Sequence, residues 1–214
     1  IIREDLNLND PYIVENGGAI YGENINGEKW EIILGDKYEL LDQILKNLSK
    51  EVEFPLTPLN NLSDKEIFEL TGLSGESLVL MKDRHWSMPF LNPPYEIEKK
   101  LSVLCKKYNV SVFKGNRMSH LLSINSNKGE AIKKLIQYSK NYKVKIIGLG
   151  DSPNDLPLLE NTDYKIIIPG LNGPNQFLLN QINFNDYIIS DKPNGYGWQK
   201  EVTKLVKTLI DRFE

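Results

Sequence analysis

Cysteine and histidine are scarce in this sequence, and each scarcity excludes a class of site. The single cysteine, Cys105, cannot form an intramolecular disulfide and is typical of a reducing compartment. The two histidines, His85 and His120, are too few to build a structural zinc site together with one cysteine. We therefore expect a cytoplasmic protein that contains neither a disulfide nor structural zinc.

Long apolar runs and an excess of basic residues are also missing. No apolar run approaches the roughly 18 residues that a membrane span requires, and the opening residues 1–5 turn polar too early for a signal peptide. Lys and Arg number 26 against 29 Asp and Glu, which gives a net charge of −3 and no basic footprint for nucleic acid. We expect a small-molecule ligand and neither a membrane nor a nucleic-acid partner. The sequence does not indicate an oligomeric state.

Strand and helix patterns alternate at both ends of the chain. Residues 11–15 predict a strand, and residues 144–149 predict a parallel strand that is buried on both faces. A helix is expected at about 128–140, a short strand at 163–168, and a final helix at about 197–212. This alternation predicts an α/β fold with a parallel sheet.

The middle of the chain has the content of a small α+β domain of its own. A strand at 30–34 precedes helices near 38–49, 63–71, 74–83 and 95–108, and strands follow at 110–114 and 118–124. The prolines at 89, 93 and 94 indicate a loop. We therefore predict a Rossmann-like core formed by residues 1–29 and 124–214, with an α+β cap domain inserted at residues 30–123.

One segment carries most of the chemistry. Gly150-Asp151-Ser152-Pro153-Asn154-Asp155 directly follows the strand at 144–149, and open α/β sheets place their ligands at such strand ends. Two carboxylates and an amide at the start of a helix suit a hard, oxygen-preferring metal such as Mg²⁺. The simpler interpretation is that Asp151 or Ser152 only caps a helix. Because Asn154 and Asp155 add polar groups that a cap does not need, we favour a functional site.

Lys128 opens the helix that precedes this segment. A lysine at a helix start is mildly unfavourable for the helix dipole, so its placement indicates a nearby anion. The alternative is that Lys128 is an ordinary surface lysine.

These two segments resemble the haloacid dehalogenase-like phosphatases. Residues 150–155 match the fourth motif of that family, Gly-Asp-x-x-Asn-Asp, and Lys128-Gly129 matches its third motif, a Lys-Gly pair that opens a helix. The resemblance implies that Asp151 binds Mg²⁺, that Asn154 approaches the phosphate and that Asp155 orients the site. It also implies that Lys128 neutralises the phosphate, and that the fold is the haloacid dehalogenase-like core with a cap.

Four further segments resemble the mannosyl-3-phosphoglycerate phosphatases of that family: residues 10–21, 70–73, 84–90 and 115–121. Two of them depart from the family pattern, since Met88 stands where glutamate is usual and two aromatic residues are replaced after Arg117. The resemblance implies that a phosphorylated sugar is the substrate and that Arg84, Arg117 and Asn16 contact it. Arg117 is equally consistent with a solvent-exposed turn residue, and Asn16 with a turn former in a left-handed conformation.

The nucleophile of that family is missing from the sequence. Those phosphatases attack phosphorus with the first aspartate of an Asp-x-Asp pair, and no two aspartates here lie two residues apart. We expect the pair to lie in a segment upstream of Ile1. Three hypotheses remain open: a sugar-phosphate phosphatase with an upstream nucleophile, an inactive sugar-phosphate-binding protein, and a phosphomutase of the same superfamily.

Overall fold

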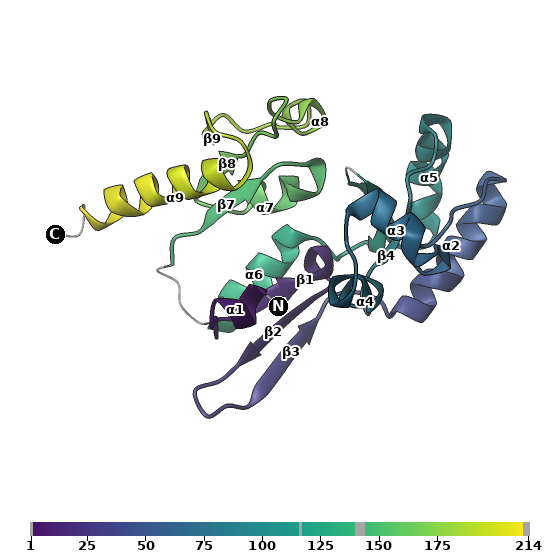
Figure 1. Ribbon diagram of the computed structural model, residues 1–214, viewed down its shortest axis with the longest axis horizontal. Coiled ribbons are helices and arrows are strands. Elements are labelled where there is room, and N and C mark those ends of the chain that lie inside the picture. Colours follow the sequence, from purple (N-terminus) through teal and green to yellow (C-terminus); the bar gives the residue numbers. More distant parts are fainter. Residues whose placement is uncertain (1, 116, 140–143, 212–214) are drawn as a thin grey trace. The chain divides into compact units, whose positions relative to one another are not determined.

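The computed structural model describes residues 2–115, 117–139 and 144–211, which form two compact units, residues 1–127 and residues 128–214 (Figure 1). Three sequence predictions reach outside the described residues: the turn residue Asn116, the helix end at residue 140 and the helix end at residue 212.

The first unit begins with a small antiparallel sheet of order β1-β2-β3. Its elements are α1 (Ile2–Asp5), β1 (Tyr12–Val14), the 3-10 turn η1 (Glu15–Gly17), β2 (Ala19–Glu23) and β3 (Lys29–Ile33). β2 pairs with β1 on one side and with all five residues of β3 on the other. The sheet therefore continues through residue 33.

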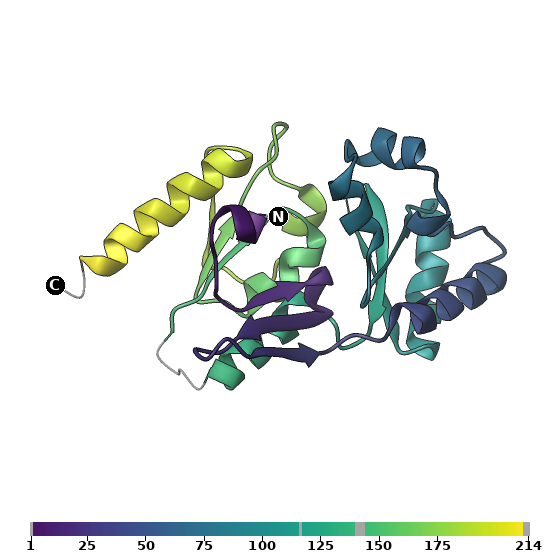
Figure 2. The ribbon, with the colours of Figure 1, turned by 60° about the horizontal axis from the view of Figure 1, so that its bottom comes forward.

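A second antiparallel sheet, of order β4-β6-β5, follows in the same unit and carries helices on both faces (Figure 2). Its elements are α2 (Tyr38–Val52), η2 (Leu59–Asn61), α3 (Asp64–Thr71), α4 (Glu76–Lys82), β4 (Met88–Leu91), α5 (Tyr95–Lys107), β5 (Val110–Lys114) and β6 (Met118–Ser123). Successive strand residues point to opposite faces. Accordingly, Phe90 packs with α2 and α5, whereas Leu91 packs with α3 and α4.

The second unit contains a parallel sheet of order β7-β8-β9. Its elements are α6 (Lys128–Ser139), β7 (Ile147–Gly150), η3 (Pro153–Asp155), α7 (Leu156–Glu160), β8 (Tyr164–Ile167), α8 (Gln176–Leu179), β9 (Tyr187–Ile189) and α9 (Asn194–Ile210). Leu159, Ile167 and Leu178 form its small buried core. The predicted parallel strand is confirmed, and it begins at Ile147 rather than at Val144.

The interpretation of Pro89 as part of a loop is wrong, because Pro89 lies within β4. Proline cannot donate a backbone hydrogen bond, so it is tolerated in a strand at the edge of a sheet. β4 is such an edge strand in the order β4-β6-β5. Edge position, which the local sequence pattern does not reveal, explains the error.

The division into a core (1–29 and 124–214) and a cap (30–123) stays a prediction. A boundary at residue 30 would pass through β3, which pairs with β2 along its whole length. The compact units divide between residues 127 and 128. The end of β3 at Ile33 therefore offers a better place for the start of an inserted domain.

Candidate active site

The polar segment 151–155 lies at the carboxyl end of β7, as the sequence predicts. Gly150, the last residue of the strand, is required by close packing. A Cβ atom at Gly150 would lie 2.6 Å from the Cβ of Asp155 and 3.1 Å from Cδ1 of Leu159. The strand end and the first turn of η3 therefore touch, and a side chain at residue 150 would push Asp155 out of its place.

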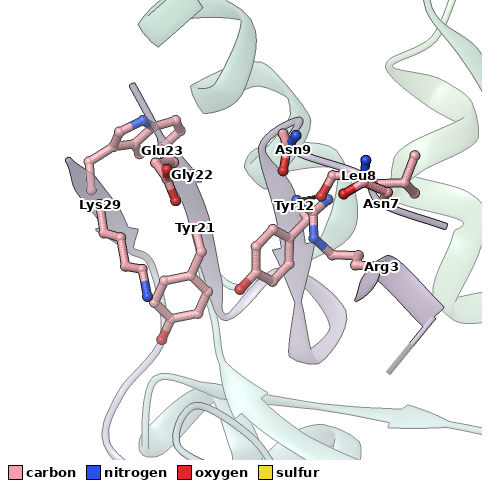
Figure 3. A pocket seen from close by; sticks show the side chains of 10 residues that line it. Arg3, Asn7, Leu8, Asn9, Tyr12, Tyr21, Gly22, Glu23 and Lys29 are labelled. Atoms are coloured by element: carbon pink, nitrogen blue, oxygen red, sulfur yellow. Dashed lines mark hydrogen bonds between the residues drawn. The ribbon is translucent and has the colours of Figure 1, made fainter. Parts of the chain in front are cut away.

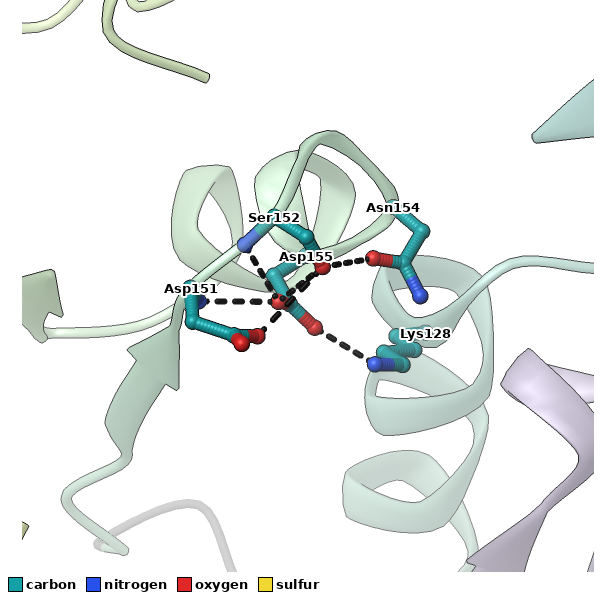
Figure 4. A network of polar contacts seen from close by, with 5 residues as sticks. All are labelled: Lys128, Asp151, Ser152, Asn154 and Asp155. Carbon is teal, nitrogen blue, oxygen red and sulfur yellow. Dashed lines mark hydrogen bonds and ion pairs between the residues drawn. The ribbon is translucent and has the colours of Figure 1, made fainter. Parts of the chain in front are cut away.

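Asp155 is the centre of the cluster and is only 4% exposed. Its Oδ2 accepts hydrogen bonds from the backbone N–H of Asp151 at 3.0 Å and of Ser152 at 3.1 Å. Its Oδ1 accepts from the Lys128 ammonium at 2.5 Å (Figure 4). Asp155 thus ties the start of α6 to the end of β7, and it uses both carboxylate oxygens to do so.

Lys128 reaches Asp155 because Gly129 lets α6 approach α7 closely. A Cβ atom at Gly129 would lie 2.2 Å from the carbonyl oxygen of Pro157 and 2.8 Å from Nδ2 of Asn161. The Lys-Gly pair therefore has a physical basis: the glycine permits the contact between helices, and the contact sets the lysine beside the carboxylate. The Lys128 side chain remains 29% exposed, so its ammonium can also face a ligand.

We expect Gly129→Ala to lower the free energy of unfolding and to disturb the contact between Lys128 and Asp155. Overpacking against a backbone oxygen costs about 1–3 kcal/mol, which exceeds the gain of about 1 kcal/mol in helix propensity. Urea denaturation should show the loss. Gly195→Ala is the matched control, because a Cβ atom at Gly195 would have no neighbour within 4 Å. Equal stability of both variants would contradict the packing argument.

Asp151 and Asn154 complete the cluster around the hydroxyl of Ser152. The Ser152 hydroxyl lies 3.3 Å from Oδ1 of Asp151 and also donates to Oδ1 of Asn154. Asp151 itself is exposed at the strand end, whereas Asp155 is buried behind it. Figure 4 shows Asp151, Asn154 and Lys128 arranged around Asp155. The arrangement presents a carboxylate, an amide and an ammonium near one another.

The two carboxylates have opposite pKa shifts. The pKa of Asp151 is raised above its ordinary value, first by partial loss of solvent and then by the negative charge of Asp155. Burial also acts to raise the pKa of Asp155, but the Lys128 charge and the backbone N–H donors outweigh it and hold that pKa below its ordinary value. Asp155 is thus the group of the pair that stays ionised to lower pH. Asp151 is the group whose charge a cation would stabilise.

A pocket of about 280 Å³ adjoins this cluster, and only two of its lining residues, Asp151 and Asp155, were predicted as site residues. Asp151 and Asp155 line one part of it, and Asn194, Gly195 and Trp198 at the start of α9 line another. No sequence motif pointed to the α9 residues. The nearest signal is the pair of glycines, 195 and 197, just before and at the start of the predicted final helix, whereas α9 itself begins at Asn194.

The other predicted residues lie in the first unit. Asn16 adopts the left-handed conformation, with φ of 58°, as expected for an asparagine that forms a turn. Arg84 is half-buried, and its Nε donates to the Met81 carbonyl at 3.0 Å. Arg117 is exposed, and its Nη1 donates to the Thr71 carbonyl at 2.5 Å. The structure therefore brings together Lys128, Asp151, Asn154 and Asp155. The other three predicted residues, Asn16, Arg84 and Arg117, do not belong to this cluster.

A separate pocket of about 340 Å³ lies in the first unit beside the β2–β3 hairpin (Figure 3). Its wall includes Tyr12, Tyr21 and Trp30, and the guanidinium of Arg3 stacks 4.1 Å above the ring of Tyr12. None of the predicted site residues lines it.

Known proteins resemble this chain over most of its length. A family of haloacid dehalogenase-like hydrolases matches residues 91–169. A glucosyl-3-phosphoglycerate/mannosyl-3-phosphoglycerate phosphatase from Persephonella marina is 27% identical over an alignment 222 residues long, which covers 98% of this chain and 80% of that protein. A mannosyl-3-phosphoglycerate phosphatase from Pyrococcus furiosus is 34% identical over 185 residues, which cover 81% of this chain and 74% of that protein. The chain belongs to the haloacid dehalogenase-like hydrolases.

The structure agrees with this family. A haloacid dehalogenase-like hydrolase from B. subtilis superposes with a TM-score of 0.58 at 14% identity, covering 88% of this chain and 77% of that one. The predicted α/β fold of the haloacid dehalogenase-like type is thereby confirmed. Both curated relatives, from Persephonella marina and Pyrococcus furiosus, are phosphatases. The chain described here is likewise a phosphatase. No helix among the described residues is both long and apolar enough to cross a membrane.

Phosphatases of this family generally use Mg²⁺. The described residues hold no group of three or more His, Cys, Asp or Glu side chains that could hold a metal ion. Mg²⁺ does not require one, because it is commonly bound by one or two carboxylates together with water and substrate phosphate. The exposed carboxylate of Asp151, with its raised pKa, fits that mode of binding.

Proposed function

We propose that this phosphatase removes the phosphate from mannosyl-3-phosphoglycerate or a close analogue, with Mg²⁺ as its cofactor. The observation that carries the proposal is the Lys128–Asp155–Asp151 cluster at the carboxyl end of β7. The names of the two curated relatives support the substrate class. The single cysteine supports a cytoplasmic location.

Each residue of the cluster has a distinct role in this proposal. Asp151 would hold Mg²⁺, which supplies positive charge to the phosphate oxygens when it is bound. The Lys128 ammonium neutralises further phosphate charge, and the Asn154 amide donates a hydrogen bond to a phosphate oxygen. Asp155 contacts no substrate. It holds the ammonium and the backbone of residues 151 and 152 in place.

The chain residues outside this cluster would recognise the rest of the substrate. Arg84 and Arg117 carry guanidinium groups, which suit the carboxylate or phosphate of a phosphorylated sugar acid. Asn16 lies in the turn that the family resemblance associates with the site. For the nucleophile, we propose an Asp-x-Asp pair outside residues 1–214, because the sequence contains none.

A sugar-phosphate-binding protein without activity is the second candidate, and the missing Asp-x-Asp pair is the observation that favours it. A phosphomutase would use the same cluster. Product analysis of the whole native protein, including any residues that precede Ile1, separates the three functions. Free phosphate is the expected product from mannosyl-3-phosphoglycerate. An isomerised sugar phosphate would indicate a mutase, and binding without conversion would indicate the binding protein.

A further inference from the structure

Glu15 occupies an unusual backbone conformation at the end of β1. Its φ is 49°, in the left-handed region that residues other than glycine and asparagine rarely adopt. Asn16 and Gly17 follow with positive φ values of 58° and 100°. Asparagine and glycine tolerate a positive φ, so the conformational strain lies mainly at Glu15, and strain of this kind persists where surrounding contacts enforce it.

The contacts that hold Glu15 come from one short segment far away in the sequence. Its carboxylate accepts hydrogen bonds from the backbone N–H of His85 at 2.9 Å, the backbone N–H of Trp86 at 3.1 Å and the hydroxyl of Ser87 at 2.6 Å. Three consecutive residues thus donate to a single carboxylate. The segment leads directly from α4 into β4.

Trp86 provides a second set of contacts that hold residues 85–87 in place. It is only 9% exposed, and its Nε1 donates to the Tyr21 hydroxyl at 2.9 Å. A Cβ atom at Gly18 would lie 2.4 Å from the Cβ of Trp86, and one at Gly35 would lie 3.1 Å from it. Two glycines therefore make room for the tryptophan. The segment is seated against both the turn after β1 and the chain that leaves β3.

Arg84 immediately precedes this seated segment. Beyond its backbone contacts and the bond from its Nε to Met81, Arg84 makes no hydrogen bond or ion pair among the described residues. It lines a concavity of about 530 Å³, whose other lining residues are Lys37, Tyr38, Glu39, Asp83, His85 and Trp86. Most of the guanidinium donors of Arg84 are therefore available to an anionic group of a ligand.

We propose that Glu15 is a positioning residue for substrate recognition. Its carboxylate fixes residues 85–87 to the turn after β1 and thereby sets Arg84 at the concavity, where Arg84 binds the carboxylate of a phosphorylated sugar acid. This inference rests on the proposed function, since it takes mannosyl-3-phosphoglycerate as the ligand. It adds a residue that does not touch the substrate but determines how the substrate is held.

The test compares Glu15→Gln with the wild type in the whole native protein. The amide of glutamine cannot accept three hydrogen bonds in this arrangement, because one of its two terminal atoms is a donor. We expect the Kd for mannosyl-3-phosphoglycerate, measured by calorimetry in EDTA so that the ligand is not hydrolysed, to rise about tenfold, as the loss of one charge-assisted contact predicts. The Kd for inorganic phosphate should change less than about twofold. Amide hydrogen exchange at His85 and Trp86 should accelerate.

Two further variants keep the test decisive. Ser87→Ala removes one of the three donors and should shift the Kd in the same direction by a smaller factor, even if Glu15→Gln folds poorly. Glu31→Gln is the matched control, because Glu31 is exposed on β3 and makes no side-chain hydrogen bond or ion pair among the described residues. It should leave both Kd values unchanged.

The outcomes separate this inference from the proposed function. Equal changes in the two Kd values, or no change in either, would overturn the positioning role of Glu15 and leave the proposed function standing. A wild-type protein that binds mannosyl-3-phosphoglycerate but releases no phosphate would overturn the proposed function, while the ratio of Kd values would still decide the role of Glu15.

Discussion

Asp151→Asn is expected to abolish Mg²⁺-dependent phosphate release while the protein stays folded. Asparagine keeps the shape of the side chain but removes the charge that a divalent cation requires. Even residues that only support metal ligands change metal affinity or activity by about 10–100-fold, so a direct ligand should exceed that range. Calorimetric titration with Mg²⁺ and an assay of phosphate release from mannosyl-3-phosphoglycerate measure the two effects.

The Asp151→Asn protein should be no less stable than the wild type. The pKa of Asp151 is raised first by partial loss of solvent and then by the charge of Asp155, so removal of the Asp151 charge relieves both a desolvation cost and a repulsion. The matched control is Asp186→Asn, whose carboxylate is exposed in the same unit and pairs with Lys165. Near-normal turnover with unchanged Mg²⁺ dependence in the Asp151→Asn protein would refute its assignment as the metal ligand.

Asp155→Ala should destabilise the protein by about 3 kcal/mol, the lower end of the range for breaking a buried ion pair. The substitution leaves the Lys128 ammonium without its partner and leaves the backbone N–H groups of Asp151 and Ser152 without their acceptor. The lower end applies because Lys128 is 29% exposed and can turn toward water. Urea denaturation measures the loss.

The pH dependence of stability gives an independent measure of the same pair. The pKa of Asp155 is lower in the folded protein than its ordinary value, so its contribution is present above the ordinary aspartate pKa and is lost as the pH falls through the folded value. Asp155→Ala should remove this part of the acid sensitivity. A double-mutant cycle with Lys128→Met should also show coupling between the two residues. Additive free energies would contradict the ion pair.

Much of the architecture was predictable because it follows local rules. The apolar stripe of α2 and the Ser63–Glu66 capping box are local signals, and the structure has both. The strand β4 was missed because its pairing with β6 depends on residues some 30 positions away. The strand β9 was missed as well, because all three of its residues are exposed and give no apolar alternation.

The site was predictable in part for the same reason. Residues 151–155 and the Lys128-Gly129 pair are contiguous segments, so their motifs could be identified directly. The contact of Lys128 with Asp155 was not predicted, and it depends on the packing of Gly129 against Pro157. The role that we infer for Glu15 depends on donors about 70 residues away. No local pattern contains that information.

Phosphate release from mannosyl-3-phosphoglycerate tests the central claim most directly, namely that Lys128, Asp151 and Asp155 form the metal and phosphate side of a phosphatase site. It should be measured with the whole native protein and with residues 1–214 alone, each in Mg²⁺ and in EDTA. We predict Mg²⁺-dependent release by the whole protein and none by residues 1–214, which lack an Asp-x-Asp pair. Turnover by residues 1–214 alone, or release that persists in EDTA, would contradict the account.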